Sequence, residues 1–412
     1  MKEDDLKIIT NDNNYFHIQV YVPIGSIHEE KGQYGISHFL EHLKFNRSKK
    51  YENNKFTKIL AEYSYNAYTT LDHTSYHITS IDKNYEKIIE IMNEIVFNTK
   101  FSDNDIQKER KIVLAEKVYS QQDKFFINDI SIYHQKNPYN RAVIGKVNDI
   151  KKLTNRDFKK YNDQYINEFF VFVTCSSKNK NKVRKLCLKK FPNPIKKDIK
   201  PLPNINLFNY ELTVRNVVDD KQILILSFKT FPSNNDDINY LDIFDHILCK
   251  GKLSKLVSLL REKKGATYRV EGSNQNFINN GFYTIKIILR KNENIKKIID
   301  LMLNEFNKLK EKKLEDKELD KYKNNYINML QLKLKDYEFH SKYFGKRLFY
   351  NKDFEMKNYI DTIKNLKSDK MLDIFNKILN YYQMNIVIYG NFDNINYTNN
   401  NIYKLIQKYR KE

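Results

Sequence analysis

Residues 25–45 of the chain are GSIHEEKGQYGISHFLEHLKF, and this stretch indicates both a fold and a chemistry. Ser37 is expected to cap a helix that begins with HFLEH. On that helix His38 and His42 are four residues apart and Glu41 is three residues after His38, so the three side chains share one face. Two imidazoles with this spacing bind one Zn²⁺ at about 2.0–2.1 Å each, with the carboxylate beside the open coordination position. Glu41 is therefore predicted to be the base that takes a proton from a water whose pKa the metal lowers to about 7.

The pattern HxxEH is the inverzincin signature, which reverses the HExxH order of other zinc peptidases. A chance match on an amphipathic helix is the alternative, and it is expected in roughly one chain in a hundred with this many histidines. A catalytic zinc site needs a third protein ligand. A suitably spaced donor elsewhere in the sequence therefore argues against the chance match.

A helix predicted at 103–120 supplies such a donor. Ser102 caps it, with Asp105 at the capping-box position. Its sequence ERKIVLAE places Glu109 and Glu116 seven residues apart, two turns along one face and among apolar residues. Two glutamates on a helix more often form a solvated face. Here the two glutamates are explained if one binds the metal and the other supports the site by contacting a metal ligand.

These stretches resemble the pitrilysin, insulin-degrading enzyme and mitochondrial processing peptidase family. Its HxxEH motif is followed by a second motif, ExxxxxxE, whose last glutamate is a ligand. In this chain Glu116 follows His42 by 74 residues and follows Glu109 by seven. The resemblance implies His38, His42 and Glu116 as ligands of one zinc ion per chain. It also implies Glu41 as the catalytic base and Glu109 as the supporting acid.

The resemblance extends to a third segment. NAYTTLDHTSYHITSI (66–81) predicts a strand, a bend and a strand, and its first part is similar to the family's NAxTxxxxTxY. This similarity implies that Asn66 and Ala67 lie on an edge strand that pairs with the substrate backbone. The chain also departs from the family, for example with Lys44 where a methionine is usual. None of these departures falls on an expected ligand.

A fourth segment, LREKKGATYRV (260–270), is similar to the LRExxGLAYSV segment of the family's second domain. The similarity implies that Arg261 and Tyr268 bind the substrate and reach its carbonyl at the metal. From the residues alone, Arg261 would be a surface charge and Tyr268 a core side chain.

Strands and helices follow the same rhythm in both halves of the chain, which predicts an α+β fold. The stretch 190–206 separates the halves and contains four of the seven prolines. We expect a catalytic zinc-binding domain at 1–195, a linker at 196–206, and a second domain at 207–412 that contributes substrate-binding residues. The resemblance implies two homologous, sandwich-like domains, each a mostly antiparallel sheet with helices on one face, which together form half of a clamshell.

The composition limits the kinds of partner. The net charge of +21 comes from lysines spread along the whole chain, which favours a general composition bias over a dedicated nucleic-acid surface. No stretch approaches the roughly 18 apolar residues of a membrane helix. The start of the chain shows neither a secretion signal nor a transit peptide. The three cysteines form no pairing pattern. A cytoplasmic or other reducing compartment is expected, with no membrane or nucleic-acid partner.

The leading interpretation is a zinc endopeptidase or oligopeptidase that hydrolyses peptides or extended precursor segments. The resemblance implies that a second half-clamshell comes from another subunit, which makes the protein a homodimer or a heterodimer with a related chain. The alternative is a noncatalytic scaffold or basic binding protein that retains the peptidase fold. Such relatives lose a histidine or the glutamate, whereas this chain has all of His38, Glu41, His42 and Glu116.

Overall fold

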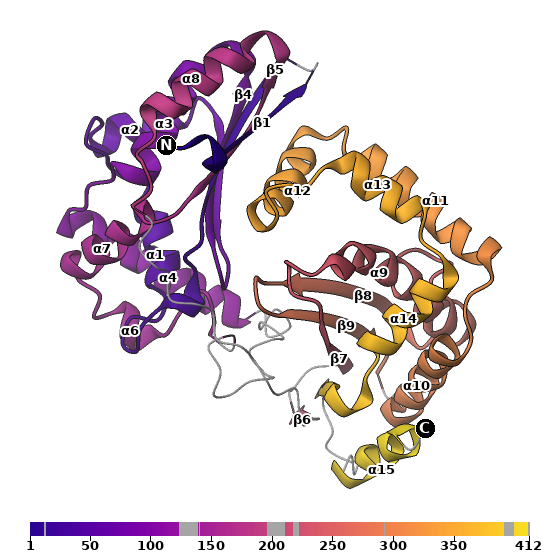
Figure 1. The fold of residues 1–412 in the computed structure, drawn as a ribbon. Coiled ribbons are helices and arrows are strands. Elements are labelled where there is room, and N and C mark those ends of the chain that lie inside the picture. Colours follow the sequence, from indigo (N-terminus) through magenta and orange to yellow (C-terminus); the bar gives the residue numbers. More distant parts are fainter. Residues whose placement is uncertain are drawn as a thin grey trace. The chain divides into compact units, whose positions relative to one another are not determined.

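The computed structural model describes residues 1–11, 14–122, 139, 141–195, 211–216, 222–291, 293–390 and 399–410. Its contacts divide the chain into two compact units, Met1–Pro203 with Tyr337–Asp353, and Asn204–Asp336 with Phe354–Glu412. Each unit has its own five-stranded mixed sheet with helices, as the α+β prediction requires (Figure 1). The expected linker at 196–206 lies outside the described residues. None of the helices in the described ranges has the length and apolarity that a bilayer crossing requires.

The sheet of the first unit has the strand order β1-β5-β2-β4-β3. Its strands are β1 (Leu6–Asn11), β2 (Tyr15–Val22), β3 (Ser64–Thr69), β4 (Thr74–Ile81) and β5 (Phe170–Ser176). β1 and β5 are parallel, and the other neighbouring strands are antiparallel. The predicted strand, bend and strand at 66–81 correspond to β3 and β4. β3 lies at the end of this order, so it is the edge strand on the side of the HFLEH helix.

Helices cover one face of this sheet (Figure 1). They are α1 (Ile36–Leu43), α2 (Asn53–Leu60), α3 (Tyr85–Phe97), α4 (Asp103–Gln122), α6 (Val147–Ile150), α7 (Asn155–Asn162) and α8 (Lys180–Lys190). α3 packs on β2 and β4 through a buried stripe at helical spacing that includes Ile88, Met92 and Ile95. Each such side chain contributes about 1.5–3 kcal/mol on burial. This stripe fixes the helical layer on the sheet.

A helix from much later in the chain covers the other face. α12 (Tyr337–Tyr350) contacts β2 and β5. A Cβ added to Gly345 would lie 2.6 Å from the Tyr21 hydroxyl, and the ring centroids of Phe349 and Tyr21 are 5.2 Å apart. Tyr21 alternates along β2 with Val20 and Val22, which face the helical layer. Both faces of the strand are covered, which explains why almost every residue of β2 is buried.

The second unit repeats the topology of the first. Its strand order is β6-β10-β7-β9-β8, again with the first and last strands of the unit parallel. The strands are β6 (Glu211–Asn216), β7 (Gln222–Thr230), β8 (Thr267–Asn276), β9 (Gly281–Leu289) and β10 (Asn385–Gly390). Its main helices are α9 (Leu241–Leu248), α10 (Ile295–Glu311), α11 (Asp316–Lys333), α13 (Met356–Lys364), α14 (Ser368–Ile378) and α15 (Asn399–Arg410). The shared order of strands agrees with two domains of one design.

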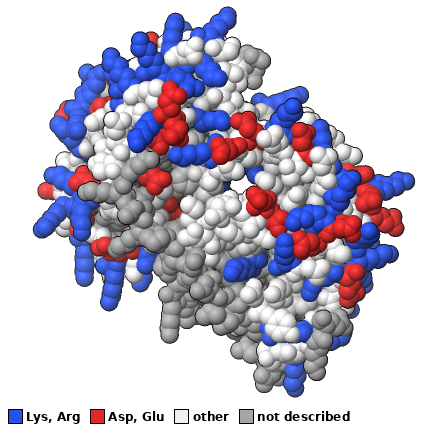
Figure 2. Space-filling view, in the orientation of Figure 1, with Lys and Arg blue, Asp and Glu red and all other residues white. Residues whose placement is uncertain are grey.

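Lysine and arginine side chains lie on both units and are interspersed with acidic ones on the face shown in Figure 2. α8, with the sequence KNKVRKLCLKK, carries lysine or arginine in each turn and buries Val183 and Cys187 against the unit. The visible charge is therefore distributed over many elements. The absence of a nucleic-acid partner remains a prediction.

Candidate metal centre

The helix that carries HFLEH begins at a close approach of two glycines. Gly35 precedes α1 with a φ of +103°, and Gly145 has a φ of +77°, a region that favours glycine. A Cβ on Gly145 would lie 2.2 Å from the Cα of Gly35. The two backbone segments therefore meet at a distance that no side chain permits. This contact fixes where α1 starts, in a sequence that contains only ten glycines.

The expected cap of this helix was wrong. Ser37 lies inside α1, because the left-handed turn at Gly35 starts the helix at Ile36. The buried carboxylate of Glu29 accepts hydrogen bonds from the backbone N–H groups of Gly35 at 2.8 Å and Ser37 at 3.0 Å. An acidic group at a helix N-terminus also interacts favourably with the helix dipole. Glu29, which lies six residues before Gly35, thus caps the helix with its side chain.

The structure brings the three expected ligands together. His38 and His42 project from α1 toward Glu116 on α4, and the potential ligand atoms all lie within 4.8 Å of one another. His38 Nε2 is 3.7 Å from one Glu116 oxygen, and His42 Nε2 is 3.4 Å from the other. Ligands of a tetrahedral zinc ion, each at about 2.0–2.1 Å, lie about 3.3–3.4 Å apart. The two imidazole nitrogens face the two oxygens of one carboxylate at close to this separation, so the three side chains fit a zinc ion.

α4 begins as predicted. The Asp105 backbone N–H donates to Ser102 Oγ at 3.1 Å, and the Ser102 hydroxyl donates to the Asp105 carboxylate at 2.6 Å. The helix then presents Glu109 and Glu116 to His42 from positions two turns apart. Lys117, next to Glu116, donates to the carbonyl oxygen of Gly145 at 2.7 Å. This bond ties α4 to the segment that touches the start of α1.

Glu109 contacts the outer side of His42. Its carboxylate is buried and lies 3.5 Å from His42 Nδ1, so with a metal bound it would accept a hydrogen bond from Nδ1–H and leave Nε2 as the ligand atom. Asn46 donates its side-chain amide to the other Glu109 oxygen at 3.1 Å. The sequence interpretation missed Asn46, although its position one helical turn after His42 was a usable signal. This arrangement is the one expected of a supporting acid.

The electrostatics of the cluster favour a positive charge at its centre. Burial lowers the pKa of His42, but hydrogen bonds to Glu109 and Glu116 outweigh it and raise that pKa to about 9. Burial and the neighbouring His42 lower the pKa of His38 to about 4, so this imidazole is neutral near pH 7 and can donate a lone pair. The hydrogen bond from His42 lowers the pKa of Glu116, which keeps the carboxylate ionised. A positive charge beside these two carboxylates is therefore favoured.

Glu41 lies on the same helix but outside the group of ligands. Its side chain is 8% exposed and accepts a hydrogen bond from the Thr69 hydroxyl. Burial raises the pKa of Glu41, which moves the carboxyl group toward the range of a general base working near neutral pH. Thr69 was not identified from the sequence, although it belongs to the NAYT segment.

The remaining sequence-predicted residues occupy two places. Asn66 and Ala67 lie on the edge strand β3, which pairs with β4 on one side. Arg261 and Tyr268 belong to the second unit, and their relation to the zinc ligands stays a prediction. Arg261 lies in a π-helix at Val257–Lys263 with its side chain 55% exposed.

Tyr268 is not a core residue, contrary to what its sequence context alone suggests. It is 67% exposed and lies where β8 shifts register against β9, between Thr267 and Arg269. A β-bulge turns a side chain away from the ladder and is common near active sites, as are π-helices. Both side chains are more than half exposed, although Arg261 Nε is also 3.8 Å from the Glu262 carboxylate.

Lys44, the departure from the family pattern, is completely buried behind the motif. Its ammonium group donates to the carbonyl oxygen of Val96 at 2.5 Å and to the Asn162 side chain, and lies over the Tyr165 ring. Burial lowers its pKa well below the usual value. Lys44 is therefore accommodated in the helical layer and contacts none of the expected ligands.

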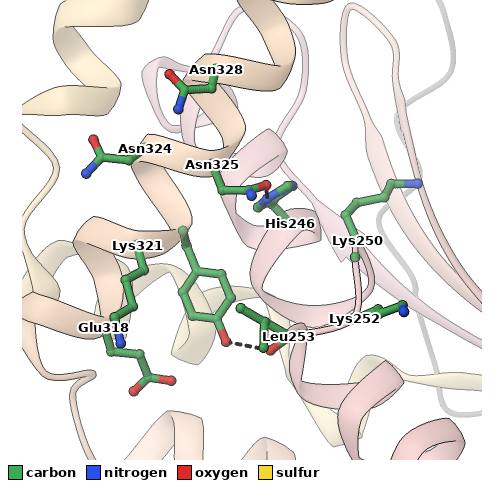
Figure 3. A pocket seen from close by; sticks show the side chains of 11 residues that line it. His246, Lys250, Lys252, Leu253, Glu318, Lys321, Asn324, Asn325 and Asn328 are labelled. Atoms are coloured by element: carbon green, nitrogen blue, oxygen red, sulfur yellow. Dashed lines mark hydrogen bonds between the residues drawn. The ribbon is translucent and has the colours of Figure 1, made fainter.

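The second unit also contains a cavity of about 620 Å³ between α9 and α11 (Figure 3). It is lined by His246, Lys250, Gly251, Lys252, Leu253, Glu318, Lys321, Tyr322, Asn324, Asn325 and Asn328. His246 Nε2 is 2.9 Å from the Asn325 side-chain oxygen, and the Tyr322 hydroxyl donates to the Leu253 carbonyl. None of the sequence-predicted site residues lines this cavity.

The comparison with known families identifies the class of protein. Residues 8–145 match the profile of the insulinase family (peptidase family M16), and residues 152–326 match the profile described as the peptidase M16 inactive domain. The chain belongs to the insulinase family of peptidases, in its short, two-domain form. The resemblance inferred from the motifs is thereby confirmed.

Individual relatives agree with this assignment. The zinc protease PqqE of Helicobacter pylori is 26% identical over 339 residues, which cover 77% of this chain and 74% of that protein. The beta subunit of the mitochondrial-processing peptidase of Dictyostelium discoideum is 26% identical over 246 residues, 56% of this chain and 52% of that one. The crystal structure of a protease from Helicobacter pylori superposes with a TM-score of 0.83 at 23% identity, covering 94% of this chain and 97% of that chain. These names indicate a peptidase family whose members use zinc.

Proposed function

We propose that this protein is a zinc-dependent endopeptidase or oligopeptidase. The observation that carries the proposal is the joint presence of a complete ligand set and a separate carboxylate on one helix. His38 and His42 face Glu116, while Glu41 lies on the same helix and is hydrogen-bonded only to Thr69 among the described residues. A noncatalytic member of the fold has no need of such a carboxylate. Its retention favours catalysis over the scaffold alternative.

The roles of the side chains follow from their positions. His38, His42 and Glu116 would hold Zn²⁺, and Glu109 orients His42 through Nδ1. When bound, the metal would lower the pKa of a water molecule and polarise the carbonyl of the scissile peptide bond. Glu41 accepts the proton of the attacking water and returns it to the leaving amine. Burial of Glu41 strengthens this exchange, because a less hydrated carboxylate holds a proton more readily.

The edge strand supports an extended peptide as substrate. β3 ends at Thr69, beside Glu41, and carries Asn66 and Ala67 a few residues earlier. A peptide that adds a strand to this edge would run toward the metal centre with its backbone hydrogen-bonded. We therefore propose that unfolded peptides or extended precursor segments are cleaved. We also propose that Arg261 and Tyr268 contact the same substrate from the second domain.

The quaternary structure and location form part of the proposal. The matched relative from Dictyostelium discoideum is named as a subunit, which supports a homodimer or a heterodimer with a related chain. Cys175, Cys187 and Cys249 are buried and form no disulfide. Free buried thiols agree with a reducing compartment such as the cytoplasm.

The decisive experiment replaces Glu41. Glu41→Gln keeps the size of the side chain and an acceptor for Thr69 but cannot take a proton. We expect unchanged zinc content and thermal unfolding, with turnover of a quenched fluorescent peptide library reduced about 10²- to 10⁴-fold. Glu168→Gln, an exposed carboxylate away from the site, is the matched control. Undiminished turnover in Glu41→Gln would refute the assignment. A wild-type protein that holds zinc and cleaves nothing would support the scaffold alternative.

A further inference from the structure

The catalytic base of the proposed mechanism has a single hydrogen-bond donor. The Thr69 hydroxyl donates to one carboxylate oxygen of Glu41 at 2.5 Å. In the part of the chain that the structure describes, no other side chain donates to Glu41. The second oxygen is thus left for water or substrate. A hydroxyl at one oxygen fixes the rotation of the carboxylate about its last bond and so fixes the direction of the other oxygen.

Thr69 is itself held by a tight turn. It is the last residue of β3 and faces Thr74, the first residue of β4. Within the turn, the Thr70 N–H donates to the His73 carbonyl at 2.8 Å. The Thr70 carbonyl accepts from Ser26 N–H at 3.1 Å, next to Gly25, where a Cβ would lie 2.4 Å from that oxygen. The turn is therefore attached to the loop that leads into α1, the helix that carries Glu41.

α12 fastens the same turn from the other side. The Tyr350 hydroxyl donates to Asp72 at 2.6 Å, across a sequence separation of 278 residues. The other Asp72 oxygen is 2.7 Å from His73 Nδ1, and both side chains are buried. The Phe349 ring also lies against His73, with centroids 5.1 Å apart. Because a buried charged hydrogen bond is short and directional, this contact restricts movement of the turn.

From this chain of contacts we infer that Thr69 is a positioning residue for Glu41, and that Tyr350 of α12 holds the turn that presents Thr69. The inference rests on the proposed function, since it assigns Glu41 as the base. By this inference, a helix from the second half of the sequence supports a catalytic centre whose residues come from the first half. Neither residue needs to touch zinc or substrate.

The test compares Thr69→Val, Thr69→Ser and Tyr350→Phe in the full chain. Val keeps the shape of threonine and removes the donor, so kcat should fall about 10- to 100-fold, the loss expected for one hydrogen bond to a charged group. KM, zinc content and thermal unfolding should stay near wild type. Thr69→Ser should restore kcat, which a purely structural role for the methyl group would not allow. Tyr350→Phe should lower kcat about 2- to 10-fold, since it loosens the turn without removing the donor.

A control on the same helix separates the turn contact from general effects on α12. Tyr343→Phe, whose ring stacks on Phe339 and lies under Arg347, should leave kcat unchanged. A crystal structure of Thr69→Val supplies a readout independent of turnover and should show the Glu41 carboxylate rotated or in several orientations. An unmoved Glu41 in that structure would overturn the inference, as would wild-type kcat in Thr69→Val while Glu41→Gln is inactive. Activity retained in Glu41→Gln would refute the proposed function instead.

Discussion

Glu109 and Glu116 are chemically identical and lie on one helix, yet they approach His42 through different nitrogens. Glu116 is 46% exposed at its side chain and faces Nε2, on the side of His38. Glu109 is buried and faces Nδ1, where a metal shared with His38 cannot bind. The difference arises because Glu109 lies two helical turns before Glu116, so the two carboxylates reach opposite sides of the His42 ring. At the scale of the residue, position therefore gives the proposed ligand and the proposed supporting acid different contacts with His42.

This distinction predicts unequal effects on metal binding. Glu116→Gln replaces an anionic ligand by a neutral amide and should reduce zinc per chain sharply. Glu109→Gln keeps an acceptor for His42 Nδ1 and should weaken zinc affinity by about 10- to 100-fold, the range for residues behind a ligand. Zinc content by mass spectrometry and competition with a chelator measure both variants. Full zinc occupancy in Glu116→Gln would remove Glu116 from the ligand set.

At the scale of the element, α1 depends on a cap outside its own sequence. Glu29→Ala would leave the buried N–H groups of Gly35 and Ser37 without their acceptor, which costs about 1–3 kcal/mol. We expect the midpoint of urea unfolding to fall accordingly and zinc content to fall with it, since α1 carries His38 and His42. Lys31→Ala, an exposed substitution in the same loop, should change neither quantity. An unchanged midpoint in Glu29→Ala would show that α1 is capped in another way.

At the scale of the whole molecule, the proposed mechanism needs both units. Tyr268 is exposed at a bulge, so Tyr268→Phe should not alter folding. If its hydroxyl stabilises the developing oxyanion, turnover should fall about 10²- to 10³-fold with zinc content unchanged. Arg261→Ala should act in the same way and also raise KM, whereas its exposed neighbour in Lys263→Ala should not. Wild-type turnover in both variants would confine the active site to the first unit.

If residues of both units contact one substrate, a preference for flexible chains is expected. Unstructured peptides should be cleaved, and a stably folded protein that contains the same cleavable segment should resist. Cleavage of matched peptide and folded substrates, followed by mass spectrometry, measures this preference. Equal rates would argue for an open site that the second unit does not cover.

The sequence by itself determined the local geometry of the candidate metal centre. The helical period places His38, Glu41 and His42 on one face of α1. It likewise places Glu109 and Glu116 on one face of α4, independently of the tertiary structure. The capping pair Ser102 and Asp105 likewise predicted the start of α4. Strand and helix order also followed from periodicity, because each element must bury one apolar side. These features depend on residues close together in the chain, and for that reason they could be predicted.

Only the tertiary structure decided which distant groups complete the site. Glu29 caps α1 in place of Ser37, Thr69 bonds Glu41, and Tyr350 reaches Asp72. Each of these contacts involves a polar side chain whose partner has no periodic spacing from it. Their partners are fixed by how β-strands, turns and helices pack. The sequence around a threonine or tyrosine does not show whether such a partner lies nearby. The same holds for α12, whose place on the first sheet depends on the fit of Gly345 to Tyr21 and not on its own helical pattern.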